Sequence, residues 1–194
     1  QQYTSVKAKP DDPFVIYHTG LLTSVRNPLQ FWKAVEALCA ENEAFRRRLK
    51  IELIGEVDAG IAAYLKQHPL LSEKVNIQGW MAHEALIQAY AKASVLLLVV
   101  NLSGYSRANI VGKLFEYLAT GKPILGIGST ESDVYDILQA TGHGLLFNHD
   151  DLEGIKGGLL RLFDESFKVK ADSDVQQYSR QALTKRLVEV LEDI

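Results

Sequence analysis

Residues 112–125, GKLFEYLATGKPIL, join a short amphipathic helix to the start of a buried strand. The run before them, residues 94–100 (SVLLLVV), is the most apolar strand pattern in the chain, and residues 101–109 are expected to form a loop of small side chains. A helix is expected from Ile110 to Thr120, with Gly121 at its end. Strand, loop, helix and strand in this order indicate a βαβ unit, whose ligands bind at the carboxyl ends of the strands. Because a helix N-terminus at that edge favours anions, the stretch predicts a nucleotide site.

The length and composition limit the classes of protein that fit this chain. Its 194 residues, 47% of them hydrophobic and 23% charged, suffice for one well-filled core. A net charge of −3 argues against a general nucleic-acid-binding protein, so we expect no nucleic acid partner. Cys39 is the single cysteine, which excludes an intrachain disulfide. No apolar run is long enough to span a membrane, and residues 1–13 lack a signal-peptide centre, so we expect a soluble, cytoplasmic protein.

Repeated βα units predict an α/β fold built on a parallel sheet. The expected strands are residues 14–18, 51–54, 75–78, 94–100, 124–127 and 144–147. Right-handed crossovers favour a Rossmann-like, doubly wound sheet of order 3-2-1-4-5-6, with its switch point between the first and fourth strands. The loops at Gly20 and Gly104 would then face each other across the site.

Helical patterns separate and follow these strands. After the first strand, Asn27 is a suitable N-cap and Pro28 would occupy the first helical position. The other expected helices are residues 57–67, 83–92, 133–141 and 151–167, followed by an amphipathic helix with Leu183, Leu187, Val190 and Leu191 on one stripe. That last helix either packs at the edge of the domain or reaches toward a missing neighbour. We interpret residues 1–13 as a linker and residues 14–194 as one domain.

Glu116 and Lys113 are the charged residues of the 112–125 stretch that chemistry could use. A ribose diol suits the Glu116 carboxylate, because two hydroxyls can donate to its two oxygens. A salt bridge or plain exposure is the alternative, and spacing alone slightly favours it. Lys113 lies one turn earlier, where it either reaches a phosphate or remains in water. Gly112, with Ser103 and Gly104 before it, leaves backbone amides open to an anion.

The first half of the chain offers a second anion contact. Gly20 follows the first strand, and Arg26 precedes the next helix, where its planar guanidinium could hold two phosphate oxygens. A solvated loop arginine is the alternative. His18 ends the strand and is more simply a satisfied core residue. The five histidines show no metal-ligand spacing, and we interpret the string His149, Asp150 and Asp151 as a helix cap.

These residues resemble the C-terminal, donor-binding half of GT-B-fold glycosyltransferases of the family 4 or group 1 kind. Residues 112–125 are similar to the family's ribose-binding helix, and Glu116 matches the second glutamate of its E-x7-E motif. Ala108 stands at the position of the first glutamate, which leaves the donor sugar undefined. Some relatives with a similar PxKxxEYxAxGxP segment also lack that acid.

The resemblance implies roles for two further segments. Residues 20–27 are similar to the family's phosphate loop, with Leu21 in place of its arginine and Arg26 in place of its lysine. Residues 75–81 resemble the stretch that contacts the nucleobase, which implies base contacts from Gly79, Trp80 and Met81. In this interpretation Arg26 and Lys113 stabilise the diphosphate together with backbone amides at the start of the ribose-binding helix. Those amides belong to Asn109, Ile110, Val111 and Gly112.

The resemblance also implies partners and a reaction. It implies a metal-independent hexosyltransferase that uses a nucleotide-diphosphate sugar as substrate, needs no cofactor and serves a surface-glycan or glycolipid pathway. An N-terminal acceptor domain of the same protein is expected, without which this chain would be inactive. The whole protein is expected at the membrane periphery through its acceptor. A nucleotide-sugar epimerase of the same fold and a non-catalytic binding or scaffold module are the alternatives.

Overall fold

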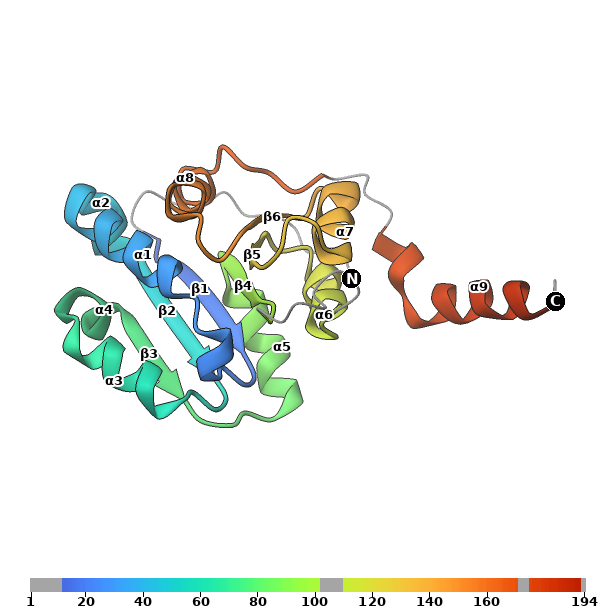
Figure 1. The fold of residues 1–194 in the computed structure, drawn as a ribbon, viewed down its shortest axis with the longest axis horizontal. Helices are drawn as coiled ribbons and strands as arrows, with labels where there is room; N and C mark the ends of the chain where they lie inside the picture. The colour runs from blue at the N-terminus through green and yellow to red at the C-terminus, as the bar shows by residue number, and fades with distance from the viewer. Residues whose placement is uncertain (1–11, 102–109, 171–174, 193–194) are drawn as a thin grey trace.

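The computed structural model describes residues 12–101, 110–170 and 175–192. Six parallel strands form one sheet of order β3-β2-β1-β4-β5-β6, with helices on both faces (Figure 1). This confirms the predicted α/β, Rossmann-like fold and its strand order. Residues 103 and 104, expected to face Gly20, lie outside the described residues.

The strands match the apolar runs closely. They are β1 (Phe14–Thr19), β2 (Leu49–Ile54), β3 (Val75–Gln78), β4 (Val95–Val99), β5 (Ile124–Ile127) and β6 (Gly144–Phe147). All residues of β4 and β5 are buried, as expected of central strands covered on both faces, whereas β3 at the sheet edge has no buried residue.

Helices connect successive strands and also follow the sheet. They are η1 (Ser24–Arg26), α1 (Leu29–Glu41), α2 (Glu43–Arg48), α3 (Ala59–Gln67), α4 (Pro69–Lys74), α5 (His83–Lys92), α6 (Lys113–Thr120), α7 (Asp133–Thr141), α8 (Leu152–Phe163), η3 (Val175–Tyr178) and α9 (Arg180–Glu192). The helices α1, α3, α4 and α8 pack on one face of the sheet, and α5, α6 and α7 on the other. None of the helices in the described part of the chain is both long and apolar enough to cross a membrane.

Asn27 does not cap α1, contrary to the sequence prediction. The helix begins at Leu29 with Pro28 in the N-cap position, and Asn27 Oδ1 accepts a hydrogen bond of 3.0 Å from the Trp32 indole. Trp32 is completely buried, so its N–H needs an acceptor that water cannot provide. The Asn27 side chain therefore accepts from the buried Trp32 indole instead of capping α1.

The start of α6 also differs from the prediction. The helix begins at Lys113 rather than Ile110, so Glu116 lies in the first turn and is exposed. Its carboxylate is thus hydrated and carries no burial penalty. The end was predicted correctly, because Gly121 adopts a left-handed φ of 68° that favours glycine. The helix expected to reach residue 167 ends at Phe163.

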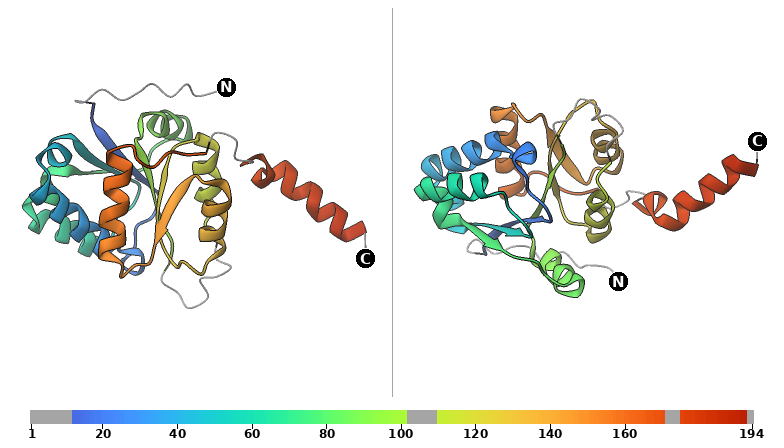
Figure 2. Two further views of the ribbon diagram at one scale, coloured as in Figure 1. Left: turned by 90° about the horizontal axis from the view of Figure 1, so that it is seen from above. Right: turned by 60° about the horizontal axis from the view of Figure 1, so that its bottom comes forward.

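The last helix, α9, extends away from the sheet and its flanking helices (Figures 1 and 2). It has no buried residue, and its exposed hydrophobic side chains are Leu183, Leu187, Val188, Val190 and Leu191. Because α9 has no buried residue, the expectation that it packs at the edge of the domain is wrong.

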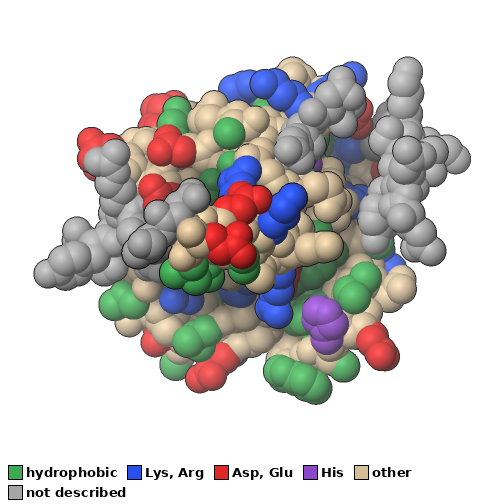
Figure 3. All heavy atoms as spheres, turned by 90° about the vertical axis from the view of Figure 1, so that its right-hand side faces the viewer, with side chains coloured by type: hydrophobic (Ala, Val, Ile, Leu, Met, Phe, Trp, Pro, Cys, Tyr) green, Lys and Arg blue, Asp and Glu red, His purple; other side chains and the backbone are tan. Residues whose placement is uncertain are grey.

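Seen from the side on which α9 projects, basic and acidic side chains lie together at the centre of the face (Figure 3).

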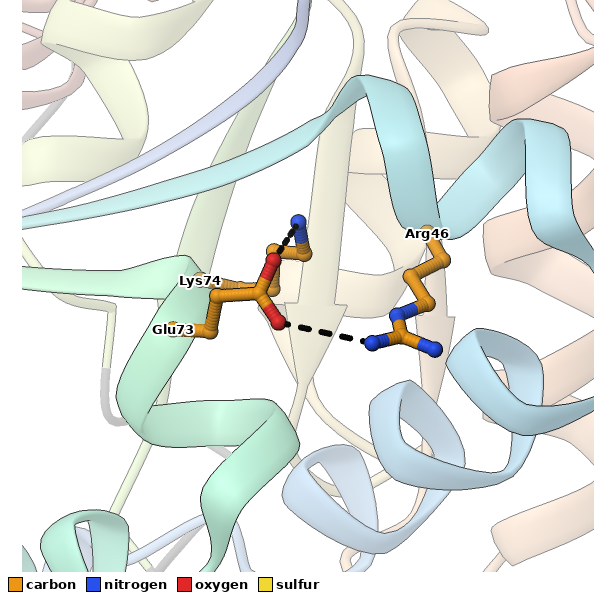
Figure 4. A network of polar contacts seen from close by, with 3 residues as sticks. All are labelled: Arg46, Glu73 and Lys74. Carbon is orange, nitrogen blue, oxygen red and sulfur yellow. Dashed lines mark hydrogen bonds and ion pairs between the residues drawn. The ribbon is translucent and has the colours of Figure 1, made fainter.

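Two short helices, α2 and α4, are joined by an ion-pair network at the surface. Arg46 lies 3.6 Å from Glu73, which also contacts the Lys74 ammonium at 2.8 Å (Figure 4). Beneath them Phe45 is fully buried against Phe14 and Phe163. The apolar contact, rather than the exposed ion pair, is expected to hold α2 in place.

We expect Phe45→Ala to lower the free energy of unfolding by about 3–5 kcal/mol, because it opens a cavity in the core. Glu73→Gln, which removes the exposed ion pair, is expected to leave the unfolding midpoint within experimental error. Urea unfolding of both variants checks the comparison, and equal losses would show that the ion pair matters as much as the core.

Candidate functional site

The site begins at Gly20, where the chain turns at the carboxyl end of β1. Gly20 has a φ of 95°, and its N–H donates to the Ile54 carbonyl at 2.7 Å. The ammonium group of Lys113, at the start of α6, donates a hydrogen bond to the Thr19 carbonyl. A Cβ atom at Gly20 would collide with that ammonium. Glycine is therefore required here both for the turn and for the approach of the lysine.

Arg26 joins the loop after β1 to the loop after β4. It ends the η1 turn, and its Nε donates to the Asn101 side-chain oxygen. Asn101 lies two residues after the end of the buried strand β4. The Arg26 and Asn101 side chains thus connect the loops after β1 and β4, which the sequence places at the switch point.

Arg26 and Lys113 form a close pair of cations at this edge. Burial lowers the pKa of Lys113, and the positive charge of Arg26 lowers it further, whereas Glu116 raises it. Repulsion between partly desolvated cations is unfavourable, and an anion placed against both would relieve it. Among the residues that the structure describes, no group of three His, Cys, Asp or Glu side chains could hold a metal ion.

Two buried tyrosines hold the end of β1 in place. The Thr19 hydroxyl lies 3.0 Å from the Tyr90 hydroxyl and 3.1 Å from the Tyr117 hydroxyl, and the Thr19 N–H donates to Tyr117 at 3.3 Å. Burial raises the pKa of Tyr117, so this group stays neutral. Because Tyr117 also belongs to α6, the cluster fixes the position of Lys113 relative to Gly20. Sequence reasoning missed this cluster, since its partners are far apart in the chain.

His18 is buried beside the cations. Its Nδ1 donates to the Leu97 carbonyl at 3.0 Å, which leaves Nε2 as an acceptor with no partner among the described residues. Burial lowers the pKa of His18 to about 4, and the charges of Lys113 and Arg26 act in the same direction. The ring is therefore neutral at pH 7. The expectation of a core histidine is confirmed, although only one of its two nitrogens is satisfied.

Glu116 faces a groove between α5 and α6. This groove has a volume of 220 Å³ and is lined by His83, Ile87, Tyr90, Ala91, Glu116, Ala119, Thr120 and Lys122. The exposed carboxylate therefore lies at the rim of an amphipathic hollow, within electrostatic reach of Lys113. This geometry leaves Glu116 available to a ligand.

The remaining candidate residues fall into two groups. In the loop after β3, Gly79 is exposed with open space around its Cα, Trp80 is 87% exposed and Met81 is partly buried. At the start of α6, Ile110 and Gly112 are exposed, and Val111 packs against the core. Ser103, Gly104, Ala108 and Asn109 lie outside the described residues.

Comparison with protein families identifies the chain. The family model described as glycosyl transferases group 1 matches residues 13–165. The chain belongs to this family. A search of curated protein sequences finds no match. The match includes the expected phosphate loop, the base-contacting stretch and the helix that carries Glu116.

Solved structures of other proteins share the fold. HepE from Anabaena, solved with UDP and glucose, superimposes with a TM-score of 0.62 at 16% identity, over 95% of this chain and 50% of that one. A UDP-forming α,α-trehalose-phosphate synthase from Burkholderia xenovorans, solved with glucose-6-phosphate, gives 0.60 at 16% identity, over 81% and 38%. The group 1 chain described here thus spans half or less of these proteins.

We expect the stability of the protein to depend on the protonation of His18. The unfolded chain binds this proton near pH 6.5 and the folded chain only near pH 4. The unfolded state therefore holds more protons in this window, and acidification lowers the free energy of unfolding by up to about 3 kcal/mol through this group. Urea unfolding across this range should show a smaller pH dependence for His18→Asn than for wild type.

His83→Asn, which changes an exposed histidine, is the control for that comparison. An equal pH dependence in wild type and His18→Asn would mean that folding does not change the pKa of His18.

Proposed function

We propose that this chain is the donor-binding domain of a glycosyltransferase that moves a sugar from a nucleotide-diphosphate sugar to a glycan or lipid-linked acceptor. The observation that carries the proposal is the pairing of Arg26 and Lys113 at the carboxyl edge of β1 and β4. These two cations come from distant parts of the chain, and the charge of Arg26 lowers the pKa of Lys113. A diphosphate supplies the missing charge at the place where doubly wound sheets bind ligands.

Negative charge grows on the diphosphate as its bond to the sugar breaks. Arg26 and Lys113 stabilise that charge from fixed positions, each by about 2–4 kcal/mol in the transition state, as oxyanion donors do. Their positions are fixed because Asn101 holds the guanidinium and Thr19 holds the ammonium. These donors perform the stabilisation without a metal ion in this proposal.

The nucleoside occupies the side of the site that Glu116 faces. The Glu116 carboxylate accepts hydrogen bonds from the two ribose hydroxyls. Trp80, which is largely free of protein contacts, offers its ring to the base, with Gly79 and Met81 beside it. Glu116 therefore positions the donor and takes no part in proton transfer.

The acceptor is expected on a second domain of the same protein. Because this chain spans half or less of the similar structures, the domain is expected to bind the donor but not to turn it over alone. The exposed apolar stripe of α9 supports such a neighbour. We place the whole protein in the cytoplasm, associated with the membrane through its acceptor.

The proposal predicts which part of a nucleotide each side chain holds. Calorimetry of this chain with UDP, GDP, ADP and CMP should reveal one preferred base. Arg26→Ala and Lys113→Ala should each weaken binding of that nucleoside diphosphate and of inorganic pyrophosphate by about ten- to a hundredfold, since charged hydrogen bonds are lost. Glu116→Gln should weaken binding of the nucleoside diphosphate by a similar factor and leave binding of pyrophosphate unchanged.

Lys66→Ala, an exposed lysine of α3 that does not line the α5–α6 groove, is the charge-matched control and should retain nucleotide binding. A scaffold module should bind none of the nucleotides. With the whole protein, an assay for released sugar against isomerised donor separates a transferase from an epimerase.

A glycine pair tests the approach of Lys113. Gly20→Ala should displace the ammonium and weaken nucleotide binding by at least about tenfold, because the methyl group occupies its place. Gly157→Ala adds the same methyl group on α8, where nothing lies within 4 Å, and should bind normally. Equal binding by both variants would remove Lys113 from the site.

A further inference from the structure

His18 is a buried titratable side chain to which the proposed function gives no role. It is 3% exposed and precedes Thr19, whose carbonyl accepts a hydrogen bond from the Lys113 ammonium. Because side chains alternate along a strand, His18 shares the face of Phe14 and Ile16, which pack in the apolar core with α1 and α8. The imidazole therefore lies at the boundary between this core and the cations of the proposed diphosphate site.

The hydrogen bonds of the His18 ring do not decide its protonation state. Nδ1 donates to the Leu97 carbonyl at 3.0 Å, and this contact needs a hydrogen on Nδ1 in the neutral and in the charged ring alike. Nε2 is shielded from solvent and has no partner among the described residues. A neutral ring leaves Nε2 without a donor, and a charged ring leaves its N–H without an acceptor. Burial and the surrounding charges therefore determine whether Nε2 carries a proton.

Two cations act on the ring from different elements, Arg26 from η1 and Lys113 from α6. Burial lowers the pKa of His18 most, and the charges of Lys113 and Arg26 lower it further, to about 4. The Leu97 carbonyl of β4 acts in the opposite direction. His149, at the same edge of the sheet, is itself kept neutral because burial lowers its pKa. The His18 ring is thus neutral because it is buried beside positive charge.

An anion held by both cations would reverse the electrostatic part of this effect. Its negative charge offsets the charges of Arg26 and Lys113, so a positive charge on His18 becomes less unfavourable. The ring is held in place, because β1 pairs with β2 and β4 on its two sides and Nδ1 is bonded to β4. His18 therefore responds to an anion by a change of protonation rather than by a change of position.

We propose that anion binding at Arg26 and Lys113 is coupled to protonation of His18. When the diphosphate binds, Nε2 takes up a proton from solvent, and the ring adds a positive charge to those of the two cations. The inference rests on the proposed function, because the diphosphate is the anion. Since coupling is reciprocal, a protonated His18 also strengthens anion binding.

Nuclear magnetic resonance tests the coupling in the wild-type chain. The imidazole nitrogen resonances of His18 report its pKa with and without saturating pyrophosphate at matched ionic strength. Pyrophosphate should raise the pKa of His18 from about 4 to about 5 or higher. His143, which is buried and precedes β6 at the opposite edge of the sheet, is the reference and should keep its pKa.

Two variants test the cause of the shift and its effect on binding. Lys113→Gln removes the ammonium and should raise the pKa of His18 in the empty protein, whereas Lys66→Gln on α3 should leave it unchanged. Calorimetry should show that wild type gains more affinity for pyrophosphate between pH 7 and pH 5 than His18→Asn does. The difference should be about two- to tenfold, as the reciprocal effect of the same coupling.

The coupling and the proposed function fail separately. A chain that binds pyrophosphate while the pKa of His18 stays the same overturns the coupling and leaves the diphosphate site in place. An equal gain in affinity for wild type and His18→Asn, or an unchanged pKa in Lys113→Gln, also contradicts the coupling. A chain that binds neither pyrophosphate nor any nucleotide overturns the proposed function, and the coupling with it.

Discussion

The contact between the Lys113 ammonium and the Thr19 carbonyl is the constraint on which the site depends. It attaches the first turn of α6 to the end of β1. The hydroxyls of Tyr90 and Tyr117 hold the same residue from the neighbouring helices. The Thr19 carbonyl at the end of β1 thereby accepts a hydrogen bond from an ammonium that would otherwise remain in solvent. Gly20 has no side chain, which leaves space for that ammonium. Removing any one of these contacts would change the position of the others.

This arrangement carries an electrostatic cost. Lys113 is partly desolvated and lies near a second cation, and the neutral His18 ring beneath them has one unsatisfied nitrogen. Folding alone does not require two cations at this place, since the core on both faces of the sheet is apolar and well filled. Shifted pKa values and unpaired buried polar atoms are often found at functional sites, where a ligand can interact with them. Under the proposed function, an anion held by both cations would lower this cost.

The sequence predicted the sheet well because its strands are marked by local patterns. Apolar runs predict the strands, and Gly121 predicts the end of α6, from short stretches of sequence. Right-handed crossovers then predict the strand order. The Asn27 cap was wrong because the buried Trp32 indole, one helical turn away, competes for the same oxygen. The Thr19 cluster and the Asn101 contact involve residues 98 and 75 positions apart, and single polar residues leave no periodic signal. The roles assigned to Glu116 and Trp80 stay predictions, since their exposure permits ligand contact without demonstrating it.

The distribution of charge along the carboxyl edge restricts the ligand more than any single residue does. Two cations, Arg26 and Lys113, are close enough for the charge of the first to lower the pKa of the second, and the Glu116 carboxylate acts on the same ammonium. In the proposed function, an anion pairs with the two cations, and paired hydroxyls pair with the carboxylate. A free phosphate would meet the cations alone, whereas a ribose joined to a diphosphate would meet the cations and the carboxylate together. The proposed nucleotide-diphosphate donor has this pattern.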